Sequence, residues 1–132
     1  MELSDINLIA VGIGAVAVFG LGFIWYAPPV FGRIWQRHIE TPPTPDTNVL
    51  AMFGPAFILI CVIGLVMAAF KPEEISGWSD GALMGSILGL GLVATSLGIN
   101  YLFARRSMTL FLIDAGYLVL TLTIFGALIA AL

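Results

Sequence analysis

The sequence predicts an all-α integral membrane protein: a bundle of four transmembrane helices with an interfacial segment after the first. Of the 132 residues, 60% are hydrophobic and only 10% are charged, whereas an ordinary soluble domain is about 25% charged. The mean hydropathy is +1.07. A soluble chain of this length has too small an interior to bury so much apolar surface, so lipid must cover it. We expect residues 1–132 to form a single membrane domain.

Four stretches are long enough to cross about 30 Å of hydrocarbon, which takes roughly 20 apolar residues. The first three contain no charged residue, and the fourth contains only Asp114. The chain starts with acidic residues, unlike a secretory signal, so we expect the first span to be retained. The predicted spans cover residues 6–26, 49–70, 81–103 and 108–132.

Residues 30–39, between the first and second spans, are predicted to lie along the membrane surface. Pro28 and Pro29 stop the preceding helix, and the residues that follow mix apolar and cationic side chains. In such a segment the apolar side chains enter the headgroup boundary, while Arg33 and Arg37 face water and anionic lipid.

The distribution of Lys and Arg predicts the orientation, because these residues are retained on the cytoplasmic side in short loops. Four arginines lie in the first and third loops, whereas the termini and second loop contain only Lys71. Both termini are therefore predicted to lie outside the cytoplasm. The predicted cytoplasmic rim consists of Arg33, Arg37, Arg105, Arg106, Trp25 and Tyr26.

Small residues and one proline are the candidate packing features. Gly81, Gly85 and Gly89 recur at every fourth position, which places a groove on one side of the third span. The groove can serve the internal bundle or self-association of two copies, and the sequence leaves both open. Pro55 lies near the start of the second span, where it removes a backbone donor and favours a kink.

Asp114 is the principal candidate site residue, because a carboxylate within the bilayer is costly unless it has partners or a function. The third and fourth spans form a hairpin that turns near Ser107, which places Asn100 opposite Asp114. We expect the Asn100 amide or the Tyr117 hydroxyl to donate to the carboxylate, and Arg105 or Arg106 can reach inward. The predicted polar cluster, on two helical faces, is Asp114, Asn100, Tyr117, Ser96 and Thr121.

Two interpretations of this cluster remain open: a set of hydrogen bonds that locks helices together, or a substrate, proton or ion site. No metal site or cofactor is predicted, since His38 has no ligand partners at suitable spacing. A single histidine also argues against Ser-His-Asp catalysis, so an enzyme is unsupported. The net charge of −3 offers no basic surface for nucleic acid.

Three groups of residues carry a resemblance that covers nearly the whole chain. They are Trp25-Tyr26-Ala27-Pro28 with Phe31-Gly32 and Trp35, Asn100-Tyr101-Leu102-Phe103 with Arg105, and Leu112-Ile113-Asp114-Ala115-Gly116-Tyr117. The sequence resembles a bacterial membrane-protein family catalogued as domain of unknown function 1761. The resemblance implies four helices and an unassigned function, and it supplies no substrate. We expect the protein to lie in the bacterial cytoplasmic (inner) membrane. The family pattern accepts Asn as well as Asp at position 114 and usually has an apolar residue at position 29.

The predicted function is a small homo-oligomeric transporter or channel-like protein with a polar cluster in its cytoplasmic half. The alternative is a non-catalytic structural or accessory subunit of a larger membrane complex, in which Asp114 is dry and fully paired. A third possibility, an enzyme acting on lipid headgroups, requires a polar cavity beside Arg33, Arg37 and Arg105. The lipid bilayer is the one partner predicted in every case.

Overall fold

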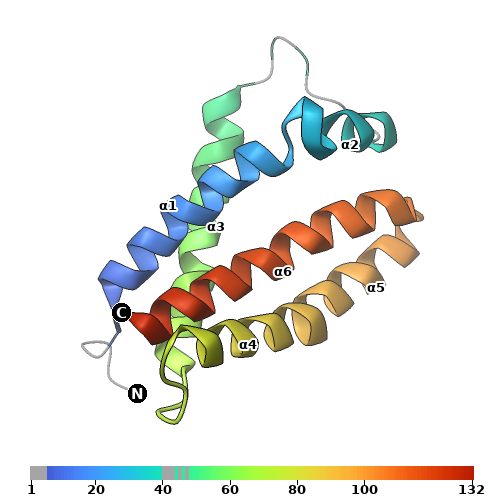
Figure 1. Ribbon diagram of the computed structural model, residues 1–132. Coiled ribbons are helices and arrows are strands. Elements are labelled where there is room, and N and C mark those ends of the chain that lie inside the picture. The colour runs from blue at the N-terminus through green and yellow to red at the C-terminus, as the bar shows by residue number, and fades with distance from the viewer. Residues whose placement is uncertain (1–5, 40–43, 45, 47) are drawn as a thin grey trace.

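The computed structural model describes residues 6–39, 44, 46 and 48–132, and its long helices are the four predicted spans (Figure 1). Each is long and apolar enough to cross a bilayer. The predicted fold class is therefore confirmed, and the chain is a multi-pass membrane protein. The spans are α1 (Leu8–Trp25), α3 (Val49–Phe70), the continuous run of α4 (Trp78–Leu88), π-helical η3 (Gly89–Ala94) and α5 (Thr95–Phe103), and α6 (Met108–Ala131).

Short polar side chains cap three of these helices. The Asn7 side chain accepts a hydrogen bond from the backbone N–H of Ala10 at the start of α1. The Asn48 side chain accepts one from the N–H of Ala51 at the start of α3. The Ser107 hydroxyl accepts the N–H of Leu110 at 3.1 Å and starts α6. Such caps satisfy backbone donors that lack partners in a first helical turn. The helix α3 continues through Pro55, whose side chain is exposed.

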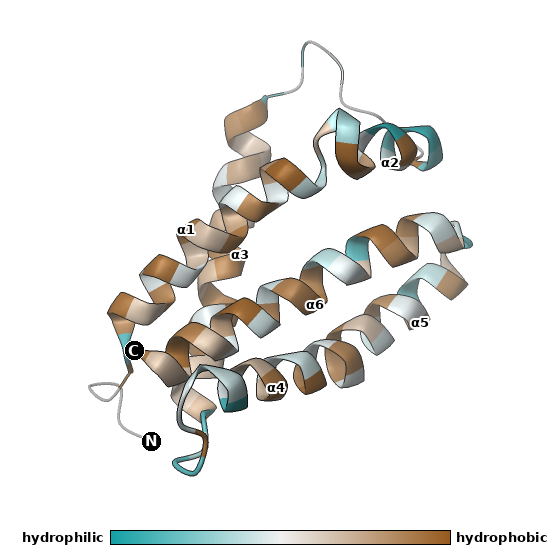
Figure 2. Cartoon of the chain, in the orientation of Figure 1, coloured by the Kyte–Doolittle hydropathy of each residue, from teal (hydrophilic) through white to brown (hydrophobic). Residues whose placement is uncertain are grey.

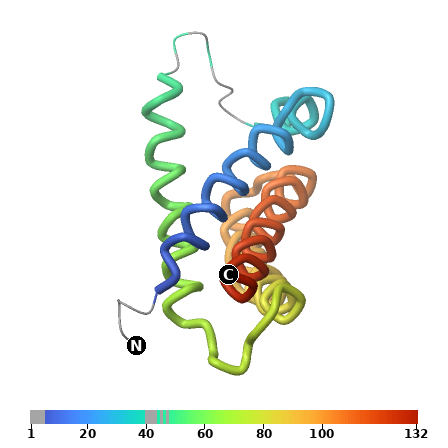
Figure 3. Tube along the Cα trace, turned by 60° about the vertical axis from the view of Figure 1, so that its left-hand side comes forward, coloured from blue at the N-terminus to red at the C-terminus, as the bar shows by residue number. Residues whose placement is uncertain are grey.

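The run α4–η3–α5 and α6 form an antiparallel hairpin, and α1 and α3 pack on α6 (Figures 1 and 3). The ring of Phe125 on α6 is fully buried at the centre of the core. A Cβ atom on Gly14 of α1 or Gly64 of α3 would lie 2.6 or 2.5 Å from this ring. Glycine at both positions lets two helices approach the same aromatic ring.

The predicted glycine groove is used inside the bundle, where it packs α4 against α6. A Cβ atom on Gly81 would lie 2.0 Å from the backbone oxygen of Gly126, and one on Gly85 would lie 2.0 Å from that of Leu122. Gly89 faces Val119 in the same interface. Backbones this close require glycine, so this face is not available for a second copy.

The π-helical segment η3 shifts the buried face of the third span by one residue. Before it, the buried positions Gly81, Gly85 and Gly89 are four residues apart. The next buried positions are Ala94, five residues after Gly89, and Tyr101, seven residues after Ala94. A π-helical turn contains an extra residue relative to an α-helical turn, so every downstream side chain is displaced by one position.

Polar residues gather at the two ends of the bundle, while the helices between them are mainly apolar (Figure 2). The short helix α2 (Arg33–His38) and the α5–α6 turn lie at one end (Figure 1). The start of α1, the α3–α4 loop and the end of α6 lie at the other. The two arginine-bearing connections are therefore on the same side of the bundle.

Candidate functional site

Asp114 is half-buried on α6 and accepts hydrogen bonds from three segments of the chain. The Tyr26 hydroxyl donates to Oδ1 at 2.6 Å, and the indole Nε1–H of Trp35 donates to the same oxygen at 3.0 Å. The Tyr101 hydroxyl of α5 donates to Oδ2. An indole N–H can only donate, so Oδ1 acts as an acceptor toward Trp35, and the two phenol hydroxyls bond to the carboxyl group from the other segments.

Tyr26 reaches this position because the chain makes a sharp corner after α1. Its backbone N–H still bonds to Gly22, and Pro28 then begins the π-helical turn η2 (Pro28–Gly32). A Cβ atom on Gly32 would lie 2.2 Å from the backbone oxygen of Tyr26, so only glycine fits there. This corner folds α2 back over α6 and presents Trp35 to Asp114.

Two further contacts join α1 to α6 beside the carboxylate. The Trp25 indole donates to the backbone oxygen of Ile113 at 2.9 Å, and the Tyr117 hydroxyl donates to that of Val18 at 2.6 Å. Gly116 and Gly22 leave room for these rings, since a Cβ atom on either would come within 3.0 Å of them. Asp114 therefore lies on a helix face that is held firmly against α1.

Tyr101 is positioned by the α5–α6 turn. Arg105 has a left-handed backbone with φ of 56°, and the N–H of Arg106 bonds to the Tyr101 oxygen. The guanidinium of Arg106 lies 5.2 Å from the centroid of the Tyr101 ring, within cation–π range. Among the described residues, Asp114 forms hydrogen bonds to hydroxyl and indole groups but no ion pair.

Tyr26, one residue beyond the end of α1, remains a neutral donor. Its burial, followed by its hydrogen bond to Asp114, raises the pKa of the phenol above its ordinary value.

The donors to Asp114 differ from those expected. Tyr117 uses its hydroxyl on α1, while Asn100 and Ser96 are exposed, and Ser96 donates to Leu92 of its own helix. The one-residue shift at η3 is the reason, because it replaces Asn100 with Tyr101 on the face toward α6. Thr121 is fully buried, and its hydroxyl has no hydrogen-bond partner among the described residues.

Sequence reasoning placed Tyr26 at the rim and missed Trp35 and Tyr101 as donors. Both belong to the residue groups that carry the family resemblance, which is the signal that could have identified them. The rim arginines are all exposed and lie on α2 or in the α5–α6 turn: Arg33, Arg37, Arg105 and Arg106.

A cavity of about 410 Å³ adjoins the Asp114 cluster. It lies between α1, α2 and α3, and two of its wall residues, Tyr26 and Trp35, are also donors to Asp114. Phe23 is 56% exposed and Met52 is 45% exposed, so the cavity opens to the outer face of α1 and α3. The remaining wall residues are Phe19, Gly22, Gln36, Phe53, Ala56, Ile60 and Tyr117.

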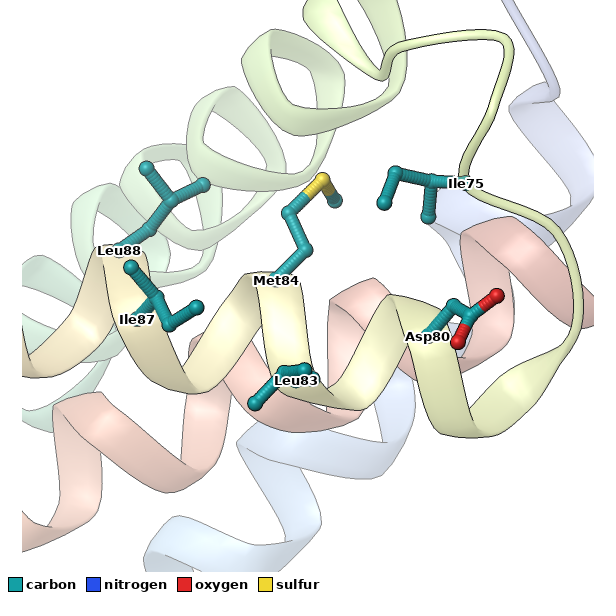
Figure 4. Close-up of a pocket in the computed structure, with 6 residues that line it drawn as sticks. All are labelled: Ile75, Asp80, Leu83, Met84, Ile87 and Leu88. Atoms are coloured by element: carbon teal, nitrogen blue, oxygen red, sulfur yellow. The ribbon is translucent and has the colours of Figure 1, made fainter.

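A second hollow of about 250 Å³ lies far from Asp114, beside α4 and the α3–α4 loop. Figure 4 shows Ile75 and Met84 projecting into it from opposite sides, with Asp80 as its one charged residue. Leu83 and Ile87 in its wall are more than 60% exposed. This hollow has the character of a lipid-facing surface groove.

Within the described residues, no three His, Cys, Asp or Glu side chains are grouped closely enough to hold a metal ion. The chemistry available at the candidate site is therefore that of aromatic rings, hydroxyl and indole donors, and one carboxylate.

Comparison with curated proteins and with solved structures gives no significant match. A family model does match, over residues 9–130, and this range includes the aromatic corner, the Tyr101 region and Asp114. The chain belongs to the family described as Protein of unknown function (DUF1761).

Proposed function

We propose that this protein is a small membrane transporter whose substrate site is the 410 Å³ cavity between α1, α2 and α3. One observation carries the proposal: Tyr26 and Trp35 form part of the cavity wall and also bond to the intramembrane carboxylate. The volume falls within the roughly 300–1,000 Å³ of ligand pockets, and mainly apolar walls with few polar groups are typical of them.

The helix α2 is the candidate moving wall of the site. It has six residues, none of them buried. Among the described residues, Trp35 makes the one hydrogen bond that joins α2 to α6. Moving α2 therefore costs little buried surface, and a substrate that displaces the Trp35 indole would open the cavity toward the end of the bundle that carries the arginines.

The proposal includes self-association and the orientation predicted from the arginines. Four short helices seldom enclose a pathway alone, so we propose a homo-oligomer in the bacterial inner membrane with both termini outside the cytoplasm. Because the α4 glycines pack on α6, a second copy must use another face. On α1, Gly12 and Gly20 have no neighbouring atom within 4 Å of an added Cβ, which leaves that face open.

A neutral fluorescent dye tests the cavity directly. N-Phenyl-1-naphthylamine should bind the purified protein in detergent, and Ala56→Trp should weaken binding at least about tenfold by filling the cavity. Val62→Trp is the matched control, because Val62 is exposed on the same helix and lies outside the cavity wall. Equal dye binding by both variants, or no binding by the unchanged protein, would refute the site.

Transport is tested separately with the protein reconstituted in vesicles. Flux of a dye that binds should be lost in Ala56→Trp and retained in Val62→Trp. Cross-linking in the membrane should give a dimer or a larger assembly of this chain alone, and a monomer would contradict the oligomeric part of the proposal.

The accessory subunit is the second candidate, and the complete bonding of Asp114 favours it. The two oxygens of Asp114 bind three donors, from the corner after α1, from α2 and from α5, and such a fully bonded carboxyl group suits a role in holding helices together. This function predicts a stable complex with other membrane proteins. Purification in mild detergent followed by mass analysis separates the candidates, since a homo-oligomer without other chains argues against the accessory role.

A further inference from the structure

We infer that the cavity takes a lipophilic organic cation, one whose charge is shielded by aryl or alkyl groups. This inference rests on the proposed function, because it names the substrate class of the same cavity. It depends on two features of the wall: the charge behind it and the rings that form it.

An acidic side chain lies directly behind the wall. The Oδ1 atom of Asp114 lies 2.6 Å from the Tyr26 hydroxyl and 3.0 Å from the Trp35 indole nitrogen, and both side chains line the cavity. The hydrogen-bond partners of Asp114 are hydroxyl and indole groups, with no ion pair among the described residues. In a medium of low dielectric constant, an ionised carboxylate attracts a cation and repels an anion more strongly than it does in water.

The wall itself contains no cationic side chain among the described residues. Arg33 and Arg37, the nearest basic residues along the chain, are exposed on α2 and do not line the cavity. An anionic substrate would therefore meet no basic partner in the wall, while a cation would face Asp114 behind it. The Arg106 guanidinium lies beside Tyr101, and neither residue lines the cavity.

Six aromatic rings line the same cavity. Phe19, Phe23 and Phe53 pack edge to face, with centroid separations of 5.2 to 6.0 Å. The faces of aromatic rings attract cations, and this attraction is stronger where water is excluded. The remaining rings are those of Tyr26, Trp35 and Tyr117. Bulky apolar groups on the cation would fill the space between Met52, Ala56 and Ile60.

Two ions of nearly the same size and shape but opposite charge provide the test. We expect tetraphenylphosphonium to bind the purified protein at least about tenfold more tightly than tetraphenylborate, measured by calorimetry in a neutral detergent. Asp114→Asn keeps an acceptor for the donors and removes the charge, so it should abolish this preference. Asp80→Asn, the same chemical change at the distant hollow, should leave both affinities unchanged.

Equal affinities of the unchanged protein for the two ions, or tighter binding of tetraphenylborate, would overturn the inference. If both ions then displace N-phenyl-1-naphthylamine, the cavity is still supported as the substrate site. If the dye itself does not bind, the proposed function is refuted. If Asp114→Asn does not fold, the comparison of the two ions in the unchanged protein decides the question alone.

Discussion

At the scale of single residues, one carboxylate connects side chains far apart in the sequence. Tyr26 and Trp35 precede Asp114 by 88 and 79 residues, and Tyr101 by 13. The acceptor capacity of a carboxylate explains how it serves three donors at once, whereas a neutral amide has one acceptor oxygen. Asp114 therefore positions two residues of the cavity wall, Tyr26 and Trp35.

Removing the carboxylate should leave three donors without a partner. Each unpaired buried donor costs about 1–3 kcal/mol, so Asp114→Ala should lower the thermal unfolding midpoint in detergent well below that of the unchanged protein. Asp114→Asn retains one acceptor oxygen, so its unfolding midpoint should lie between those of Asp114→Ala and the unchanged protein. If Asp114→Ala unfolds at the same temperature as the unchanged protein, the hydrogen bonds to Asp114 do not stabilise the fold.

Replacing Trp35 by Phe removes one of these bonds. An aromatic ring is kept, but the N–H donor and part of the indole surface are lost, and loss of a hydrogen bond alone costs roughly 0.5–1.5 kcal/mol. Trp78→Phe is the control, because Trp78 is 68% exposed at the other end of the bundle. Thermal unfolding should distinguish the two variants, and equal stabilities would show that the Trp35 bond contributes nothing.

At the scale of elements, close backbone contact between α4 and α6 sets the geometry of the hairpin that carries Tyr101 and Asp114. The carbonyl oxygens of Gly126 and Leu122 occupy the space that Cβ atoms on Gly81 and Gly85 would need. This contact fixes the register of the two helices, and with it the depth at which their polar side chains meet.

A single methyl group at this contact should be poorly tolerated. Gly85→Ala must push α4 away from the backbone of α6, and overpacking of this kind costs about 1–3 kcal/mol, with backbone contact at the upper end. Gly91→Ala in the same span has nothing within 4 Å of the added Cβ and should be neutral. The yield of folded protein after size-exclusion chromatography compares the two, and a well-folded Gly85→Ala would contradict the packing argument.

At the scale of the whole molecule, the two arginine-bearing connections and the α2 wall of the cavity lie at the same end of the bundle. The arginines predict that this end faces the cytoplasm. The cavity would then exchange substrate with the cytoplasmic leaflet or the cytoplasm, and the α3–α4 loop would face the other side.

Cysteine labelling tests this orientation in a Cys61→Ala background. Ser76→Cys lies in the α3–α4 loop and Ala104→Cys in the α5–α6 turn, and both positions are exposed. A membrane-impermeant maleimide should label Ser76→Cys in intact cells and Ala104→Cys only after lysis. The opposite pattern would reverse the predicted topology.

The parts predictable from sequence are those that depend on length and local composition. Apolar runs located all four spans, and the isolated charge identified Asp114 as the residue to examine. Its donors could not be predicted from helical spacing, because regular α-helical spacing selects Asn100 where the shifted helix presents Tyr101. Spacing also gave no indication of Trp35, since the close backbone contact at Gly32 that folds α2 inward leaves no periodic signal.

The π-helical segment η3 also determines how the third span can change in length. A one-residue deletion within Gly89–Ala94, for example of the exposed Leu90, would convert the wide turn into a regular one and leave the flanking contacts in place. The same deletion in α5 would rotate Tyr101 by about 100° away from Asp114. The third span thus contains one short stretch where the chain can lose a residue and keep its site.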